Sequence, residues 1–127
     1  MTTEIAGAAA RLSEARSVAT AATVAAEAVA AECDEVQKHI DALRAERDEI
    51  AAERRAGKHD HEHAGKLALI DMDIADLAPL VAEVSGRLTT ANAAAVEAEQ
   101  EALRAEQALA VERAKVVRGE LVALEPA

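Results

Sequence analysis

The sequence predicts an all-α protein: a long antiparallel helical hairpin, a two-helix coiled coil expected to associate into a larger helical bundle. Three observations lead to this fold class. Alanine supplies 35 of the 127 residues while Phe, Tyr and Trp are absent. Apolar residues recur at alternating spacings of three and four in both halves of the chain. Large and small residues are distributed symmetrically about its middle.

The composition favours thin, closely spaced helices. Alanine has the highest helix propensity because its side chain loses no conformational entropy in a helix. It also buries little apolar area, so it cannot fill a thick core. A chain rich in Ala, Glu and Arg that contains no aromatic residue is therefore typical of a coiled coil or a long helix.

The first helix is predicted over about residues 3–56. Its apolar residues follow an unbroken heptad pattern, which indicates a helix wrapped against a partner helix. Arg47 is the one polar exception. We call this set the first seam: Ile5, Ala8, Leu12, Ala15, Ala19, Ala22, Ala26, Val29, Cys33, Val36, Ile40, Leu43, Arg47 and Ile50.

A turn is predicted within residues 57–65, where two glycines frame a polar stretch. Gly57 can adopt the left-handed conformation that ends many helices. Asp60 is suited to cap the next helix, with Glu62 in its first turn.

The second helix is predicted over about residues 66–124, with a kink near Pro79 because proline lacks the amide that would bond to the carbonyl of Ala75. A break into two helices at this proline is the alternative. The second seam stays in phase throughout: Leu67, Ile70, Ile74, Leu77, Val81, Val84, Leu88, Ala91, Ala95, Ala98, Ala102, Ala105, Leu109, Glu112 and Val116.

A fold-back at residues 60–61 matches the two seams by size. Ile50 then meets Ile70 and the isolated Leu12 meets Leu109, so large residues oppose large ones and alanines oppose alanines. Strict alternation of seam layers would shift this register by about three residues. The rival fold is a continuous rod in a parallel dimer or trimer, which would need a helix through the glycines of residues 57–65.

Arg47 has two interpretations in the hairpin. It lies opposite Ile74, near three aspartates with which it can pair: Asp71, Asp73 and Asp76. An arginine on a seam needs such partners. Alternatively, the guanidinium reaches water along its aliphatic stem.

A second apolar row distinguishes the second helix. It consists of Val96, Leu103, Ala110, Val117 and Leu124 at intervals of seven, joined by Leu121. The row is expected beside the seam and has no counterpart on the first helix. Because exposed apolar stripes mark interaction sites, we predict partner binding or self-association through Val96, Leu103, Val117, Leu121 and Leu124. The alternatives are a broadened core, or Leu121 and Leu124 folding over the open end.

Composition and motifs weigh against several other classes of function. The net charge of -10, with basic residues scattered among acids, disfavours nucleic-acid binding. The longest uncharged stretch, residues 17–26, is too short to span a membrane, and the start of the chain lacks the features of a secretory signal. We therefore expect a soluble protein made in the cytoplasm. The single cysteine, Cys33, excludes an internal disulfide.

No enzymatic activity, cofactor or metal is predicted, because phosphate-binding, nucleophile and zinc-protease motifs are absent. One cluster of potential metal ligands does occur in the turn: His59, Asp60, His61, Glu62 and His63. Structural zinc sites usually draw ligands from two separate places in a chain. A polar hairpin tip explains the cluster fully, and we favour this interpretation over a metal site.

The Ala/Glu/Arg-rich heptads around residues 55–77 resemble those of small coiled-coil structural or assembly proteins of tailed bacteriophages. This resemblance implies a symmetric oligomer in a virion: a connector, a tail or fibre component, or a scaffold. The expected function is thus that of a structural spacer, connector or scaffold whose partners are other protein subunits, including copies of itself. The alternative is a cytoplasmic adaptor or chaperone that grips a client helix.

Overall fold

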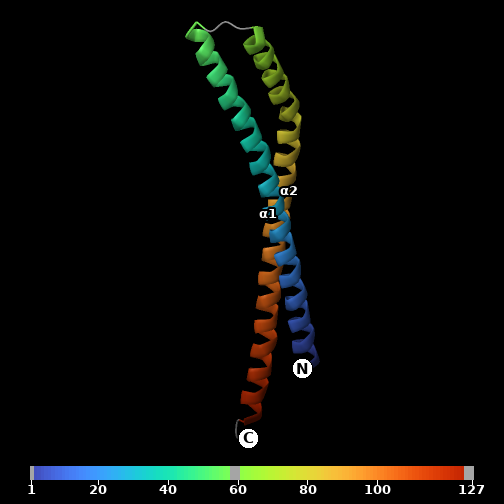
Figure 1. Cartoon of the computed structure of the whole chain (residues 1–127). Helices are drawn as coiled ribbons and strands as arrows, with labels where there is room; N and C mark the ends of the chain where they lie inside the picture. The colour runs from blue at the N-terminus through green and yellow to red at the C-terminus, as the bar shows by residue number, and fades with distance from the viewer. Residues whose placement is uncertain (1, 58–60, 125–127) are drawn as a thin grey trace. The chain divides into compact units, whose positions relative to one another are not determined.

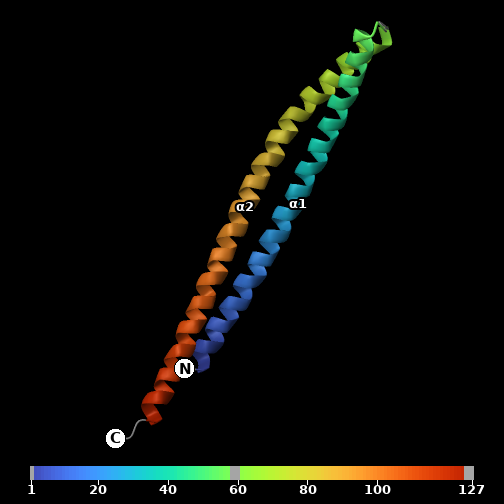
Figure 2. The same cartoon turned by 90° about the vertical axis from the view of Figure 1, so that its left-hand side faces the viewer.

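The computed structural model describes residues 2–57 and 61–124, apart from the side chains of Thr2, Leu121 and Leu124. Within these ranges the chain forms two α-helices and no strand: α1 is Thr2–Arg55 and α2 is His61–Leu124. The helices run in opposite directions and pack against each other (Figures 1 and 2). The predicted helical hairpin is confirmed, and the continuous rod is wrong.

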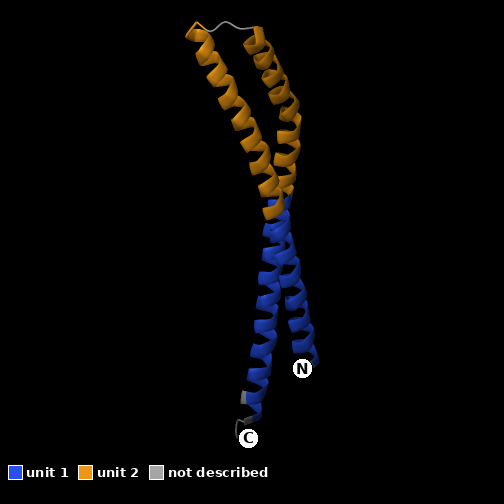
Figure 3. Cartoon of the chain, in the orientation of Figure 1, with its two compact units in different colours: residues 1–26, 91–127 blue, residues 27–90 orange. Residues whose placement is uncertain are grey.

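The chain divides into two compact units, each built from a segment of both helices (Figure 3). Unit 1 comprises residues 1–26 and 91–127, and unit 2 comprises residues 27–90. The two are described separately below.

The two predicted seams supply the core of both units. Every residue of the first and second seams is buried or half-buried, including the polar Arg47 and Glu112. All the buried apolar residues described here belong to a seam: Ala8, Leu12, Ala26, Ile40, Ile50, Ile70, Val84, Ala98 and Leu109. The spacing of three and four therefore identified the contact face of each helix correctly, because residues at this spacing lie along one side of a helix.

In unit 1 the core is thin. Ala8, Leu12 and Leu109 form its buried cluster, so the predicted meeting of Leu12 with Leu109 is confirmed. The residues packed around this cluster are Ile5, Ala9 and Ala105. Since alanine side chains fill much of the rest of the seam, this unit buries less apolar area per turn than a leucine-lined pair of helices would.

In unit 2 the core is bulkier, and ion pairs join the helices. Ion pairs link Glu32 Oε2 to Arg87 Nη1 at 2.8 Å and Arg47 Nη1 to Asp71 Oδ1 at 3.3 Å. Of the two interpretations of Arg47, pairing with a flanking aspartate is the one observed, although 43% of its side chain stays exposed. The pair places the cation at the edge of the seam, where water still screens it.

The turn is shorter than predicted at its C-terminal side, because α2 begins at His61 and not near residue 66. The predicted left-handed conformation of Gly57 is confirmed by its φ of 99°. The Gly57 amide donates to the carbonyl of Arg54 at 3.1 Å. Asp60, the predicted cap, lies outside the described residues. Gly65 is tolerated inside α2 because a glycine in a helix costs only about 1 kcal/mol relative to alanine. The carboxylate of Glu62, in the first turn of α2, interacts favourably with the positive end of the helix dipole.

The helix α2 continues without interruption through Pro79, so the alternative of two separate helices is wrong. Proline removes one backbone hydrogen bond, to the carbonyl of Ala75. Both residues are exposed, so water can satisfy that carbonyl. The predicted kink at this point stays a prediction.

Candidate functional site

The second apolar row is the surface that the sequence singled out, and its described large residues lie in solvent. Val96 and Leu103 are each 54% exposed and Val117 is 53% exposed. The interpretation of the row as a broadened core is therefore wrong for these three residues. The side chains of Leu121 and Leu124 lie outside the described part of the chain.

The direction of this row around α2 follows from its spacing relative to the seam. Val96, Leu103 and Val117 each follow a seam residue by one place. One residue turns the side-chain direction by about 100° around a helix. The row thus lies about a quarter turn around α2 from the seam residues that precede it.

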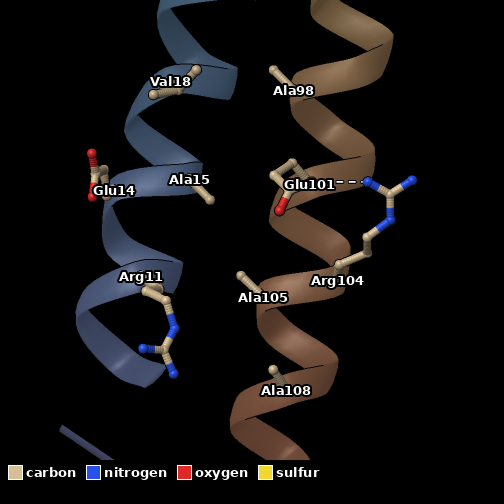
Figure 4. Close-up of a pocket in the computed structure, with 9 residues that line it drawn as sticks. All are labelled: Arg11, Glu14, Ala15, Val18, Ala98, Glu101, Arg104, Ala105 and Ala108. Atoms are coloured by element: carbon tan, nitrogen blue, oxygen red, sulfur yellow. Dashed lines mark hydrogen bonds and ion pairs between the residues drawn. The ribbon is translucent and has the colours of Figure 1, made fainter. Parts of the chain in front are cut away.

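A groove in unit 1 is a second candidate surface, and the sequence alone did not predict it. It has a volume of about 470 Å³ and opens to solvent between the two helices (Figure 4). The residues that line it from α1 are Arg11, Glu14, Ala15 and Val18, and those from α2 are Ala98, Glu101, Arg104, Ala105 and Ala108.

The alanine content of the seams creates this groove. Ala15, Ala98 and Ala105 occupy seam positions, and their methyl groups leave space that larger side chains would fill. Val18 lies in the wall with 55% of its surface exposed. The groove therefore offers an apolar floor to a side chain from outside the molecule.

Charged residues form both walls of the groove in the same order. Glu14 and Glu101 lie at about the same level on the two helices, and the backbone positions of Arg11 and Arg104 follow about one turn further along in the same direction (Figure 4). Within α2, Arg104 Nη1 donates to Glu101 Oε2 at 2.8 Å. Such a pair, about two-thirds exposed on both side chains, contributes little stability and can be exchanged for another partner.

At the turn, the structure describes three of the five potential metal ligands: His61, Glu62 and His63. His59 and Asp60 lie outside the described residues, and His61 is exposed. His63 Nε2 lies 3.1 Å from Glu53 Oε2 of α1. In the ranges that are described, no three His, Cys, Asp or Glu side chains come together in a way that could hold a metal ion.

His63 has a packing role that the sequence reading missed. It is half-buried and lies four residues before Leu67, so it continues the second seam by one position. The spacing of four before Leu67 signals this role, although a histidine among other polar residues is also typical of a turn. Its contact with Glu53 joins α2 to α1 next to the turn.

Cys33 is half-buried, as expected for a seam residue that behaves as a small apolar side chain. It borders a hollow of about 230 Å³ in unit 2, together with Val36, Val81 and Val84. The arrangement is that of a packing residue at the margin of the core.

In the described residues, neither helix has a segment apolar enough over a sufficient length to cross a membrane. Comparison with protein-family models, curated proteins and solved structures finds no match to this chain. The function is therefore inferred from its two exposed surfaces, the second apolar row and the groove.

Proposed function

We propose that this chain is a non-enzymatic structural coiled-coil protein that serves as a spacer, connector or scaffold in a large protein assembly. The proposal rests on one observation above others. Val96, Leu103 and Val117 are each more than half exposed on a helix whose seam is already buried against α1. A helix that is apolar on two sides favours contact with a second partner.

The spacing within the second apolar row suits a helical partner. Residues at intervals of seven stay on one side of a helix, which is the geometry by which helices pack along one another. Burying one Val or Leu side chain contributes about 1.5–3 kcal/mol. Three such residues supply enough free energy to offset part of the cost of association.

A bacteriophage virion is the assembly in which we place this role. The resemblance of residues 55–77 to small phage coiled-coil proteins supports that setting, and it favours a symmetric oligomer. The net charge of -10 further supports solubility before assembly, or docking on a basic protein surface.

An adaptor or chaperone that grips a client helix is the second candidate. The groove in unit 1 favours it, because an apolar floor between charged walls fits an amphipathic helix. The two candidates differ in what the protein does alone. A structural subunit forms a fixed oligomer, whereas an adaptor stays monomeric until its client is present.

Replacement of Leu103 and Val117 by Glu tests the proposal. The double variant is expected to lose its assembled state in multi-angle light scattering, because association would then bury carboxylates. Its helix content, measured by circular dichroism, should stay unchanged since both sites are exposed.

The matched control places Glu at Val24 and Leu69, which are 58% and 61% exposed and lie outside the row. It adds the same charge and should retain the mass of the unmodified protein. If the Leu103→Glu/Val117→Glu protein keeps that mass as well, the row is not the interface. A monomeric unmodified protein that gains order with one client would favour the adaptor.

A further inference from the structure

The order of charges on the walls of the groove makes this surface complementary to itself. Each helix carries a glutamate and then, one turn further along in the same direction, an arginine: Glu14 and Arg11 on α1, Glu101 and Arg104 on α2 (Figure 4). In the single copy Arg104 Nη1 donates to Glu101 Oε2, and this exposed pair can be exchanged for the same pair formed between copies. A second copy that faces the groove after a rotation by half a turn about an axis across the helices presents this order in reverse. Each arginine then meets a glutamate, so the charges on both walls are matched at once.

We propose that the groove of unit 1 binds the same groove of a second copy, with a two-fold axis that crosses the helices. In this pair α1 lies antiparallel to the second copy's α1, and α2 lies antiparallel to its α2. Arg11 pairs with Glu14 of the second copy, and Arg104 pairs with Glu101 of the second copy. A two-fold interface doubles every such contact, because each residue occurs on both sides.

The same alignment matches the side chains next to the charges by size. On α1 it sets the exposed Val18 opposite Gly7 of the second copy. On α2 it sets Val111, which is 53% exposed, opposite Ala94 of the second copy. A large residue packs against a small one in both places, so the helices can approach closely. Around Gly7 the nearest side-chain atom is Arg11 Nη1, at 3.6 Å from the position that a β-carbon would take.

The same charges disfavour a pair in which the two hairpins point in the same direction, which we call the parallel arrangement. A two-fold axis along the helices would set α1 against the second copy's α2. Arg11 would then face Arg104, and Glu14 would face Glu101. Like charges opposed across an interface are destabilising, so the charge order selects the antiparallel pair.

This inference rests on the proposed function in so far as the chain works by association with protein subunits. It adds the identity of one partner, a second copy, and a surface distinct from the second apolar row. The adaptor function would instead leave the groove free for a client helix.

A charge swap on α1 tests the inference, with dimerisation measured by sedimentation velocity over a range of concentrations. Arg11→Glu sets two glutamates against each other on both sides of the two-fold axis and should raise the dissociation constant about tenfold or more. Adding Glu14→Arg restores opposite charges in swapped positions, so Arg11→Glu/Glu14→Arg should return to within about threefold of the unmodified protein.

Arg113→Glu is the control, since Arg113 is exposed, lies outside the groove and gives the same change in net charge. It should leave the dissociation constant nearly unchanged. Tighter association of Arg11→Glu would indicate the parallel arrangement and overturn the inference. So would a monomeric unmodified protein, no effect of Arg11→Glu, or failure of the swap to restore association.

The outcomes also separate this inference from the proposed function. Loss of assembly by Leu103→Glu/Val117→Glu, with no effect of the charge swap, would leave the structural function standing without the groove. The opposite result would show that copies associate through the groove and that the second apolar row is not needed.

Discussion

In both units of the hairpin two helices pack along their seams, but the seam side chains differ in size. In unit 2 the buried seam residues are large and aliphatic: Ile40, Ile50, Ile70 and Val84. In unit 1 alanines make up most of the seam, with Leu12 and Leu109 as the buried large residues. Burial of a methyl group contributes far less free energy than burial of a Leu or Ile side chain.

This difference indicates which unit contributes most to folding stability and which carries the candidate binding surfaces. Unit 2 combines a bulky core with ion pairs that join its helices, Glu32 with Arg87 and Arg47 with Asp71. Unit 1 combines a thin core with a groove and with the exposed second apolar row. We infer that unit 2 supplies most of the stability of the hairpin, and that the partners proposed above would stabilise unit 1 when they bind.

Truncation of a large seam residue in unit 2 should have the largest effect on stability. Ile70 is only 5% exposed, and Ile70→Ala should lower the free energy of unfolding by about 2–5 kcal/mol because it removes buried methylene groups and leaves a cavity. Urea unfolding followed by circular dichroism measures this change.

The neighbouring Leu69 provides the control, since it is 61% exposed. Leu69→Ala should change the free energy of unfolding by no more than about 0.5 kcal/mol. Equal effects of the two variants would mean that the bulky seam of unit 2 is not the main source of stability.

Hydrogen exchange should show the contrast between the units directly. Amides of residues 15–22 and 95–105 in unit 1 are expected to exchange at least about tenfold faster than those of residues 36–50 and 70–84 in unit 2. A thinner core opens at a lower free energy, and a tenfold difference corresponds to about 1.4 kcal/mol.

Concentration serves as the internal control of this measurement. If partners order unit 1, its amides should become more protected as the protein is concentrated, while those of unit 2 should change little. Equal protection of both units in dilute solution would remove the distinction between them.

The sequence predicted the contact face of each helix because that face depends on the spacing of residues within one helix. The seam residues from Ile5 to Ile50 and from Leu67 to Val116 are all buried or half-buried. The distribution of large and small seam residues also predicted that the chain folds back on itself, since a bulky stretch packs best on another bulky stretch. These features are local or nearly local, and pattern alone determines them.

Features that depend on geometry between the helices were predicted less well. The groove forms where Ala15 and Ala98 leave space between α1 and α2, and no spacing within a single helix reports such space. The start of α2 at His61 was missed because Gly65 was read as part of the turn.

The ion pair between Glu32 and Arg87 should have the smallest effect on the free energy of unfolding. The two side chains are about half exposed and lie 2.8 Å apart. A double-mutant cycle with Glu32→Ala and Arg87→Ala is therefore expected to give a coupling free energy of about 0.2–1 kcal/mol, because water screens exposed pairs. The same cycle on Glu35 and Lys38, which lie 3.9 Å apart within α1 and are more exposed, should give a smaller coupling. A coupling well above 1 kcal/mol for Glu32 and Arg87 would mean that charge, and not the bulk of the seam, accounts for much of the greater stability of unit 2.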